Sequence, residues 1–564
     1  LSSSPDGQIL EYDFHLDVFP AGKLSGNVYA SELDDRIPRP FLPSLDRRRE
    51  RWGAGLFFND PKLPMQLTWE RVFDELRSGA NSLYDDEDRL DETLRYEATW
   101  QPTEYHSLRM EYEYERRREK FSGTGTRFDT TRNYVVVNHV LQFGRDHLSR
   151  LETLARFQDE TGDLARDTYE IAPQLRLQWT DKLSTTFRAQ YLKETFADLS
   201  VRTWRGDAVI THQLDWLTST ADIYALRQNS DDDADSTEWG GSAGMFFNRE
   251  NKLGRLSANL TYTHTATRTS DGRRSGLALS ESLTFRDPQL SYLAQADVER
   301  GAIVVTSSDR SRVYLPGIDY VVVRIGRYTA LTRVRNGRIA DRETVLVSYT
   351  YRAADSFELS RDRLDFRVQQ DFKFGLTPYY AGSIQEEDIA GDRFLSFRER
   401  NVNRHRIGAT YRRPRWSLGL EYEFNDDSID PYEALHVNGD VVMLEKVQHS
   451  LSGQMSMSRF LFDGSRDLQR RNTTLVDVGM AYRYLLGDRF EADAAGAFRW
   501  EDDSLFGRTK GVDLSASLSY RFGFLSALFE VEYDYLDLPD SSDNTVAFWF
   551  KLKREIPVIT SRRR

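Results

Sequence analysis

Apolar and polar residues alternate strictly at the start of this chain. Residues 10–18 read Leu-Glu-Tyr-Asp-Phe-His-Leu-Asp-Val, and such alternation indicates a β-strand with one apolar and one polar face. The pattern returns, for example, at 108–114, 169–179, 364–372 and 512–522. It recurs about 26 times in units of about 10 residues, which is typical of transmembrane strands. The sequence therefore predicts an all-β protein, a transmembrane antiparallel β-barrel of about 26 strands.

Composition agrees with one large sheet. No Pro- or Ser-rich linker interrupts the 564 residues, of which 29% are charged and 12% aromatic. The mean hydropathy of -0.61 is low for a membrane protein, but a barrel strand needs apolar residues on one face only. No apolar run reaches the length of about 18 residues that a transmembrane helix requires. A soluble all-β protein is the alternative, and solubility without detergent would establish it.

Cysteine content and net charge exclude several functions. The chain has no cysteine, which rules out thiolate catalysis and covalently attached c-type haem in this chain, and suits passage through an oxidising compartment. The net charge of -13 argues against nucleic acid as a partner. Because the chain begins at Leu1 without an apolar signal segment, we expect a mature or trimmed form. The expected location is the outer membrane of a Gram-negative-type bacterium.

Short turns and longer acidic segments alternate along the chain, as in barrels with short periplasmic turns and long outer loops. Tight turns are expected at 20–23, 144–146, 251–254 and 523–524. Irregular loops are expected at 34–50, 78–92, 121–131, 230–236, 425–438 and 501–510.

One segment departs from the alternation and separates two groups of barrel strands in the sequence. Residues 301–351 contain dense β-branched runs, which favour strands buried on both faces. We interpret this segment as a small β-rich insert that caps the barrel, plugs its lumen or forms a soluble domain. Two ordinary strands with a long loop are the alternative. The expected organisation is barrel over 1–300, insert over 301–351, barrel over 352–554 and a tail over 555–564.

The polar face of each strand is expected to line a wet lumen, because a charge on the lipid face near the midplane costs about 2–4 kcal/mol. The lining is then strongly charged. A charged lining would suit selectivity for ions or for a partner. Alternatively, it is a solvated wall whose charges pair locally, and for any single residue we favour this second interpretation. The expected lumen residues are Glu11, Asp13, Asp17, Arg109, Glu111, Glu113, Arg176, Arg188, Asp365, Arg367, Glu530 and Glu532.

Large aromatic residues near strand ends predict girdles at the lipid–water interfaces. These tryptophans share the apolar parity of their strands, which favours girdles over sugar-binding platforms inside the lumen. The expected girdle residues are Trp100, Trp179, Trp216, Trp239, Trp416 and Trp500.

No set of residues predicts an enzyme. The 9 histidines are scattered, and neither a nucleophile elbow nor a phosphate-binding loop occurs. Asp231, Asp232, Asp233 and Asp235 are weak Ca²⁺ candidates, but they lack EF-hand spacing, so solvated surface charge is the favoured interpretation. Divalent bridges from such acidic loops to lipopolysaccharide phosphates are a third possibility.

The whole pattern resembles the large outer-membrane β-barrel superfamily, which includes porins. Residues 546–552, Val-Ala-Phe-Trp-Phe-Lys-Leu, are similar to the closing strand that the barrel-assembly machinery recognises, although the family usually ends on an aromatic residue and this chain continues to Arg564. Strands begin by about residue 8, so the N-terminal plug of TonB-dependent transporters is not expected. The lipopolysaccharide-inserting barrel differs in having cysteines and a soluble N-terminal domain. In size the chain is most similar to sheath barrels of multihaem cytochrome conduits, although it lacks their Cys-x-x-Cys.

The width of the predicted barrel decides which functions we consider. An aqueous channel opens at about 16–18 strands, so a wider lumen needs an occupant. We expect a channel or sheath whose lumen is filled or narrowed by its own loops, by the insert or by a partner protein; the similarity to sheath barrels suggests a multihaem cytochrome, with haem in that partner alone. The alternatives are a passive porin or an exporter of polysaccharide or protein, and a non-conducting structural or adhesive surface barrel.

Overall fold

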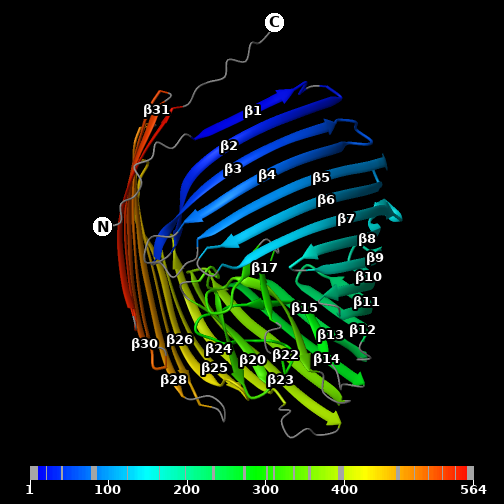
Figure 1. The fold of residues 1–564 in the computed structure, drawn as a ribbon. Coiled ribbons are helices and arrows are strands. Elements are labelled where there is room, and N and C mark those ends of the chain that lie inside the picture. The colour runs from blue at the N-terminus through cyan, green and yellow to red at the C-terminus, as the bar shows by residue number, and fades with distance from the viewer. Residues whose placement is uncertain are drawn as a thin grey trace.

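The computed structural model describes residues 11–554 with gaps at 21, 40–41, 78–85, 123–124, 164, 197–198, 232–234, 271–274, 300–302, 309–311, 335–336, 353–356, 392–398, 465–469, 488, 506, 524 and 540. A sheet of 25 strands, β1–β14 and β22–β32, curls into a barrel (Figure 1). Within the described part of the chain, no helix is long and apolar enough to cross a membrane.

The elements run in the following order. The first part of the barrel contains β1 (Tyr12–Val18), β2 (Leu24–Arg39), β3 (Leu42–Phe58), β4 (Met65–Arg77), β5 (Glu87–Thr103), β6 (His106–Phe121), β7 (Arg127–Phe143), the 3-10 turn η1 (Arg145–His147), β8 (Ser149–Gly162), β9 (Arg166–Thr180), β10 (Leu183–Phe196), β11 (Leu199–Gln213), β12 (Leu217–Ser230), β13 (Asp235–Asn251) and β14 (Gly254–Ser270). The insert contains β15 (Ser275–Thr284), β16 (Ser291–Tyr292), β17 (Val304–Ser307), β18 (Val313–Tyr314), β19 (Tyr320–Ile325), β20 (Tyr328–Arg333) and β21 (Thr344–Arg352). The second part contains β22 (Phe357–Phe372), β23 (Leu376–Gly391), β24 (Val402–Arg413), β25 (Trp416–Asp427), β26 (Tyr432–Glu445), β27 (His449–Phe462), β28 (Arg471–Leu486), β29 (Phe490–Asp503), β30 (Gly507–Phe522), β31 (Leu525–Leu538) and β32 (Ser541–Arg554).

Each barrel strand pairs antiparallel with its neighbour in the chain, with one interruption. β14 pairs with β22, from Gly254 opposite Phe372 to Thr269 opposite Phe357, so the whole insert is carried on the connection of one hairpin. At the seam, Lys551 of β32 forms an ion pair with Glu11 beside β1, while no ladder joins β1 to β32 among the described residues. The described residues form 25 barrel strands, where the sequence pattern predicted about 26.

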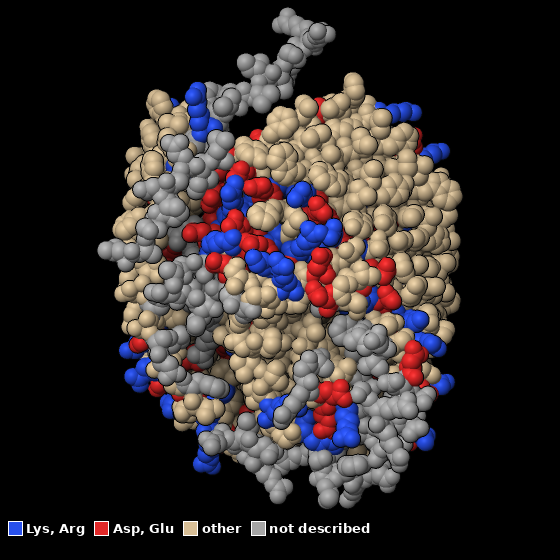
Figure 2. Space-filling model, viewed as in Figure 1, with Lys and Arg blue, Asp and Glu red and all other residues tan. Residues whose placement is uncertain are grey.

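The outer face of the wall is apolar, as the alternation predicted. On β1, Phe14 is 52% exposed, and on β32, Phe548 is 71% exposed and Phe550 65%. Figure 2 shows a broad uncharged surface on the visible side of the barrel wall. Such an extended exposed apolar belt is unfavourable in water and indicates contact with lipid. The predicted fold class is confirmed: the chain is a transmembrane β-barrel with the architecture of outer-membrane barrels.

All connections at one end of the barrel are short, and we call it the turn end. The longest connections and the insert lie at the other end, which we call the loop end. β3, β5 and β7 have 17 residues each, whereas a membrane crossing needs about 9–11. The wall therefore projects beyond the bilayer at the loop end.

The loop predicted at 34–50 is wrong, because β2 continues to Arg39 and β3 starts at Leu42. Charges on both faces suggested a loop, but cross-strand ion pairs accommodate them: Arg47 lies 2.5 Å from Asp35, and Arg48 lies 2.8 Å from Glu32. A patch of acidic and basic residues is visible on this side of the molecule (Figure 2).

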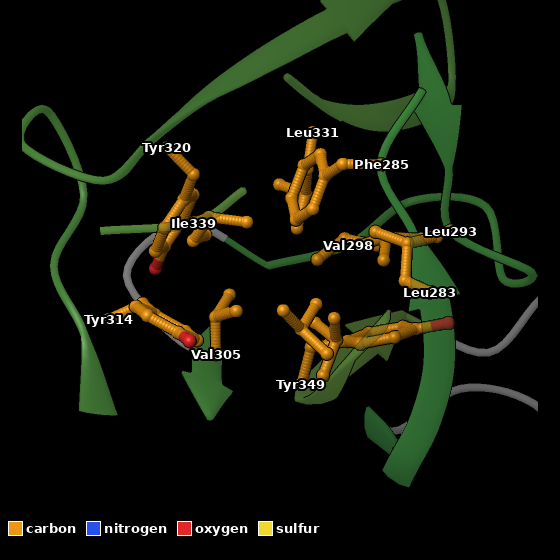
Figure 3. Close-up of a cluster of buried hydrophobic side chains, with 12 residues drawn as sticks. Leu283, Phe285, Leu293, Val298, Val305, Tyr314, Tyr320, Leu331, Ile339 and Tyr349 are labelled. Atoms are coloured by element: carbon orange, nitrogen blue, oxygen red, sulfur yellow. The ribbon is translucent and has the colours of Figure 1, made fainter. Parts of the chain in front are cut away.

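The insert is a small domain with its own core. It contains a four-stranded sheet, β15-β21-β17-β18, and a three-stranded sheet, β16-β20-β19. Twelve buried side chains fill the space between them, including Val305, Leu331 and Val345 at 0% exposure (Figure 3). The small sheets start at Ser275, before the expected boundary at 301, because Leu283 and Phe285 face this core instead of lipid.

Candidate functional site

The insert lies inside the loop-end mouth of the barrel (Figure 1). Arg338 of the insert lies 3.3 Å from Glu87 at the start of β5, and Arg166 at the start of β9 donates to Ser280 at 2.9 Å. Gln289 donates to Tyr432, the first residue of β26, at 3.1 Å. These strands stand on opposite sides of the ring, so the insert crosses the lumen. We call residues 275–352 the plug.

A buried arginine forms the contact between the plug and β5–β6. The Arg338 side chain is 4% exposed, and its carboxylate partners Glu87 and Asp319 are 2% and 0% exposed. Arg338 lies 2.6 Å from Asp319 within the plug, and its guanidinium lies 4.8 Å from the centre of the Phe121 ring of β6. Ion pairing and a cation–π contact thus join the plug to the wall in a water-poor environment.

The second contact lies across the mouth, where residues 287–292 of the plug meet β24–β28. Arg471 donates to the carbonyl oxygen of Pro288 at 2.6 Å, and its guanidinium lies 4.1 Å from the Phe462 ring centre. The Arg400 guanidinium lies 5.2 Å from the ring centre of Tyr292. This side of the mouth also combines cationic and aromatic groups.

Asp430 lies beside this contact, in the turn between β25 and β26. Burial raises the pKa of Asp430 to about 6, and the nearby Asp427 carboxylate adds to the increase, while Arg471 and Arg400 oppose it. Burial also raises the pKa of Tyr292. The plug thus docks next to a carboxyl group that titrates in the mildly acidic range.

A chamber of about 450 Å³ lies between the plug and the inner face of β22–β26. Its charged lining consists of Arg363, Arg367, Arg400, Arg404, Arg406, Asp365, Asp427 and Asp430. Arg363 pairs with Asp365 at 2.7 Å and Arg400 with Asp427 at 2.8 Å, while Arg404 pairs with Glu423. The arginines outnumber the aspartates, so this wall region favours negative charge in the chamber.

Two chamber arginines differ from the other three. Arg367 donates to the neutral Gln369 side chain at 2.9 Å, and its guanidinium lies 4.5 Å from the Tyr379 ring centre. Within the described part of the chain, neither Arg367 nor Arg406 has a carboxylate oxygen within 4.0 Å. Their charges are therefore the least compensated in the lining.

Glu421, Glu423 and His436 lie next to the chamber, with one ligand atom from each within 4.8 Å of the others. Glu423 already accepts hydrogen bonds from Arg404 and from Tyr432, the latter at 2.9 Å. Both bonds go to Oε1 of Glu423, and Glu421 accepts a hydrogen bond from Tyr379. Because both carboxylates already have protein partners, we assign no metal to this group.

The sequence-predicted lumen residues lie on the inner face, and many pair within the wall. Glu113 lies 2.5 Å from both Arg95 and Arg132. Arg109 lies 3.1 Å from Glu97, and Arg188 lies 3.7 Å from Asp207. Asp17 lies 3.0 Å from His15, and Glu111 lies 3.4 Å from Arg95. Arg176 donates to Gln178 at 3.4 Å. Asp13 and the buried Glu532 also belong to this face.

Asp365 and Arg367 are the members of the predicted set that line the chamber. Glu530 instead lines a second hollow of about 370 Å³ near the turn end of β27–β31. The predicted set is thus distributed around the wall and does not form one site.

The predicted girdle tryptophans lie toward both ends of the strands. Trp100, Trp179, Trp216 and Trp416 lie close to short turns, whereas Trp239 and Trp500 lie toward the loop end. Five of them are 41–60% exposed, and Trp500 is half-buried.

The two described aspartates of the calcium candidate pair with arginines instead of converging. Asp231 lies 3.2 Å from Arg202, and Asp235 lies 3.3 Å from Arg227. Asp232 and Asp233 lie outside the described residues.

Sequence reasoning missed Arg338, Glu87 and Arg406. Arg404 and Arg406 share the polar parity of the alternating segment at 402–413, a signal that identifies lumen residues. No local signal joins Arg338 to Glu87, because 251 positions separate them.

No protein-family model and no curated protein matches the chain. Among solved structures, the chain is similar to the siderophore receptor PirA from Pseudomonas aeruginosa, with 11% identity, 84% of this chain and 76% of that chain covered, and a TM-score of 0.41. It is also similar to the copper transporter OprC, with 10% identity, 94% and 81% covered, and a TM-score of 0.44. At these low TM-scores, we carry neither ligand nor mechanism from those proteins to this chain.

Proposed function

We propose that the protein is an outer-membrane transport barrel whose loop-end mouth is closed by its own plug, which controls the passage of small solutes. The observation that carries the proposal is the docking of one compact insert against β5, β9 and β26–β28 at the same end of the barrel. A catalytic role has no comparable support.

The need for closure follows from size. An aqueous channel already opens at about 16–18 strands, and the described part of this wall has 25. An unfilled lumen of that width would let small solutes cross freely. The plug occupies the position where it would prevent such leakage.

The construction of the plug suits movement as a unit. Its core is internal, and its wall contacts are mainly ionic and hydrogen-bonded, like interfaces between domains that move. β14 and β22 pair directly with each other. Movement of the plug would therefore break no pairing of the barrel ladder.

Conductance in planar bilayers tests the proposal. The variant lacks residues 275–352, which a short Gly-Ser linker replaces, and the β14–β22 pairing provides for its folding. We expect low conductance from the intact chain and large, stable steps from the deletion variant, with far-ultraviolet circular dichroism as the folding control. Equal high conductance would favour the passive porin or exporter. A folded deletion variant that stays closed would favour a non-conducting surface barrel.

A partner-filled sheath is the second candidate, and the hollow in the inner wall near the turn end of β27–β31 would be one contact for such a partner. Because the plug occupies the loop end, a partner such as a multihaem cytochrome would enter from the turn end. This candidate requires haem absorbance and a second protein in the complex purified in mild detergent. A preparation with neither would reject it.

A further inference from the structure

We propose that the chamber beneath the plug binds a small polyanion, with two or more carboxylate or phosphate groups, between Arg367 and Arg406. The inference rests on the proposed function in one respect: the bound anion is the solute that the plug retains or admits. Anion binding itself does not require the plug to move.

The register of three neighbouring strands places the two arginines together. Arg367 of β22 lies opposite Ala381 of β23, and Ala381 lies opposite Arg406 of β24. Neighbouring strands lie about 4.8 Å apart, so the two arginine Cα atoms are about 10 Å apart in one row. The small side chain of Ala381 leaves the space between the two guanidinium groups to a ligand.

Charge compensation singles out the same pair. Each of the other three chamber arginines pairs with a carboxylate, whereas Arg367 contacts the neutral Gln369 and the Tyr379 ring. The remaining chamber carboxyl group, Asp430, belongs to the plug end of the chamber. Two cations without a carboxylate oxygen within 4.0 Å, on one wall of the chamber and within a chain of net charge -13, concentrate positive potential there.

The chemistry of the lining defines the ligand class. A guanidinium group binds carboxylate or phosphate through two parallel hydrogen bonds, so two such groups suit an anion with charge at both ends. Asn259, directly opposite Arg367 in the register, and Ser383 add neutral polar groups to the chamber. The volume of about 450 Å³ lies within the range for small-molecule sites.

Calorimetric titration of the full chain in detergent at low ionic strength tests the inference, with citrate, pyrophosphate and sucrose as probes. We expect citrate or pyrophosphate to bind and sucrose not to bind, and the better anion identifies the carboxylate or phosphate class. The double variant Arg367→Gln/Arg406→Gln should weaken binding at least about tenfold, because two charged contacts are lost. Ala381→Leu, which fills the space but keeps both charges, should also weaken binding.

Arg176→Gln is the matched control. Arg176 also lies on the inner face and donates to a glutamine two positions along its strand, but it does not line the chamber. Its loss should leave binding unchanged. The inference is overturned if neither anion binds, if the double variant binds as well as the wild type, or if Arg176→Gln weakens binding equally. Since binding in detergent and bilayer conductance are independent, failure of the anion site is distinguishable from failure of the plug.

Discussion

Arg338 is the residue on which docking of the plug to β5 depends most. Its side chain is 4% exposed and joins Glu87 of the wall to Asp319 of the plug. Removing one member of a buried ion pair costs about 3–5 kcal/mol, because it leaves an unpaired buried charge. Arg338→Met should therefore weaken the docking of the plug by about that amount.

The urea dependence of proteolysis within the plug measures this effect. Arg342→Met is the control, since Arg342 lies in the plug but is 85% exposed, and surface substitutions usually change stability by less than about 0.5 kcal/mol. Equal protease resistance of the Arg338 variant and the wild type would contradict the docking role of Arg338.

Asp430 gives the plug contact a pH dependence. Its folded-state pKa is raised to about 6 from an ordinary value of 3.8, so the folded protein binds a proton more tightly than the unfolded chain. Protonation of Asp430 therefore adds stability as the pH falls through 6, and this added stability is lost as the pH rises again. Unfolding at about pH 5 and about pH 7.5 should show this gain in the wild type, whereas Asp430→Asn should lack it. The same gain in both proteins would assign the pH dependence to other groups.

At the scale of elements, the parity of each strand decides the solvent that each side chain meets. Ile407 in the middle of β24 is 60% exposed on the outer face, whereas Thr410 of the same strand lies on the inner face. Ile407→Lys should cost about 2–4 kcal/mol of folding free energy in lipid vesicles, and Thr410→Lys far less, because the first charge meets lipid and the second meets water. Equal costs would show that the faces are assigned wrongly.

Strand alternation predicted the barrel and its faces, but not where the strands end. The segment 34–50 reads as a loop because it carries charges at consecutive positions, yet Asp35 and Arg47 pair across β2 and β3. Outside the bilayer both faces of a strand meet water, so the constraint that produces alternation no longer acts. The start of β15 was missed for a related reason, since its apolar side chains face the plug core and not lipid.

At the scale of the whole molecule, local sequence patterns do not reveal that the plug lies in the mouth of the barrel. The dense β-branched runs of the insert predicted a buried β-rich segment, but its place in the mouth depends on contacts such as Arg471 with Pro288, 183 positions apart. For the chamber, the sequence predicted Asp365 and Arg367 as inward-facing residues. It could not show that Arg406 shares the row of Arg367, because strand register is a tertiary property.

The most direct test of the central claim, that the insert lies inside the mouth, is cross-linking of introduced cysteines in proteoliposomes. The chain contains no cysteine, so every introduced pair is unique. Gln289→Cys with Tyr432→Cys joins plug to inner wall, where the native side chains are 3.1 Å apart, and Gln289→Cys with Leu435→Cys targets the exposed outer face of the same strand. A short bifunctional maleimide should link the first pair efficiently and leave the second unlinked. Linkage of the second pair, or of neither, would contradict a plug in the lumen.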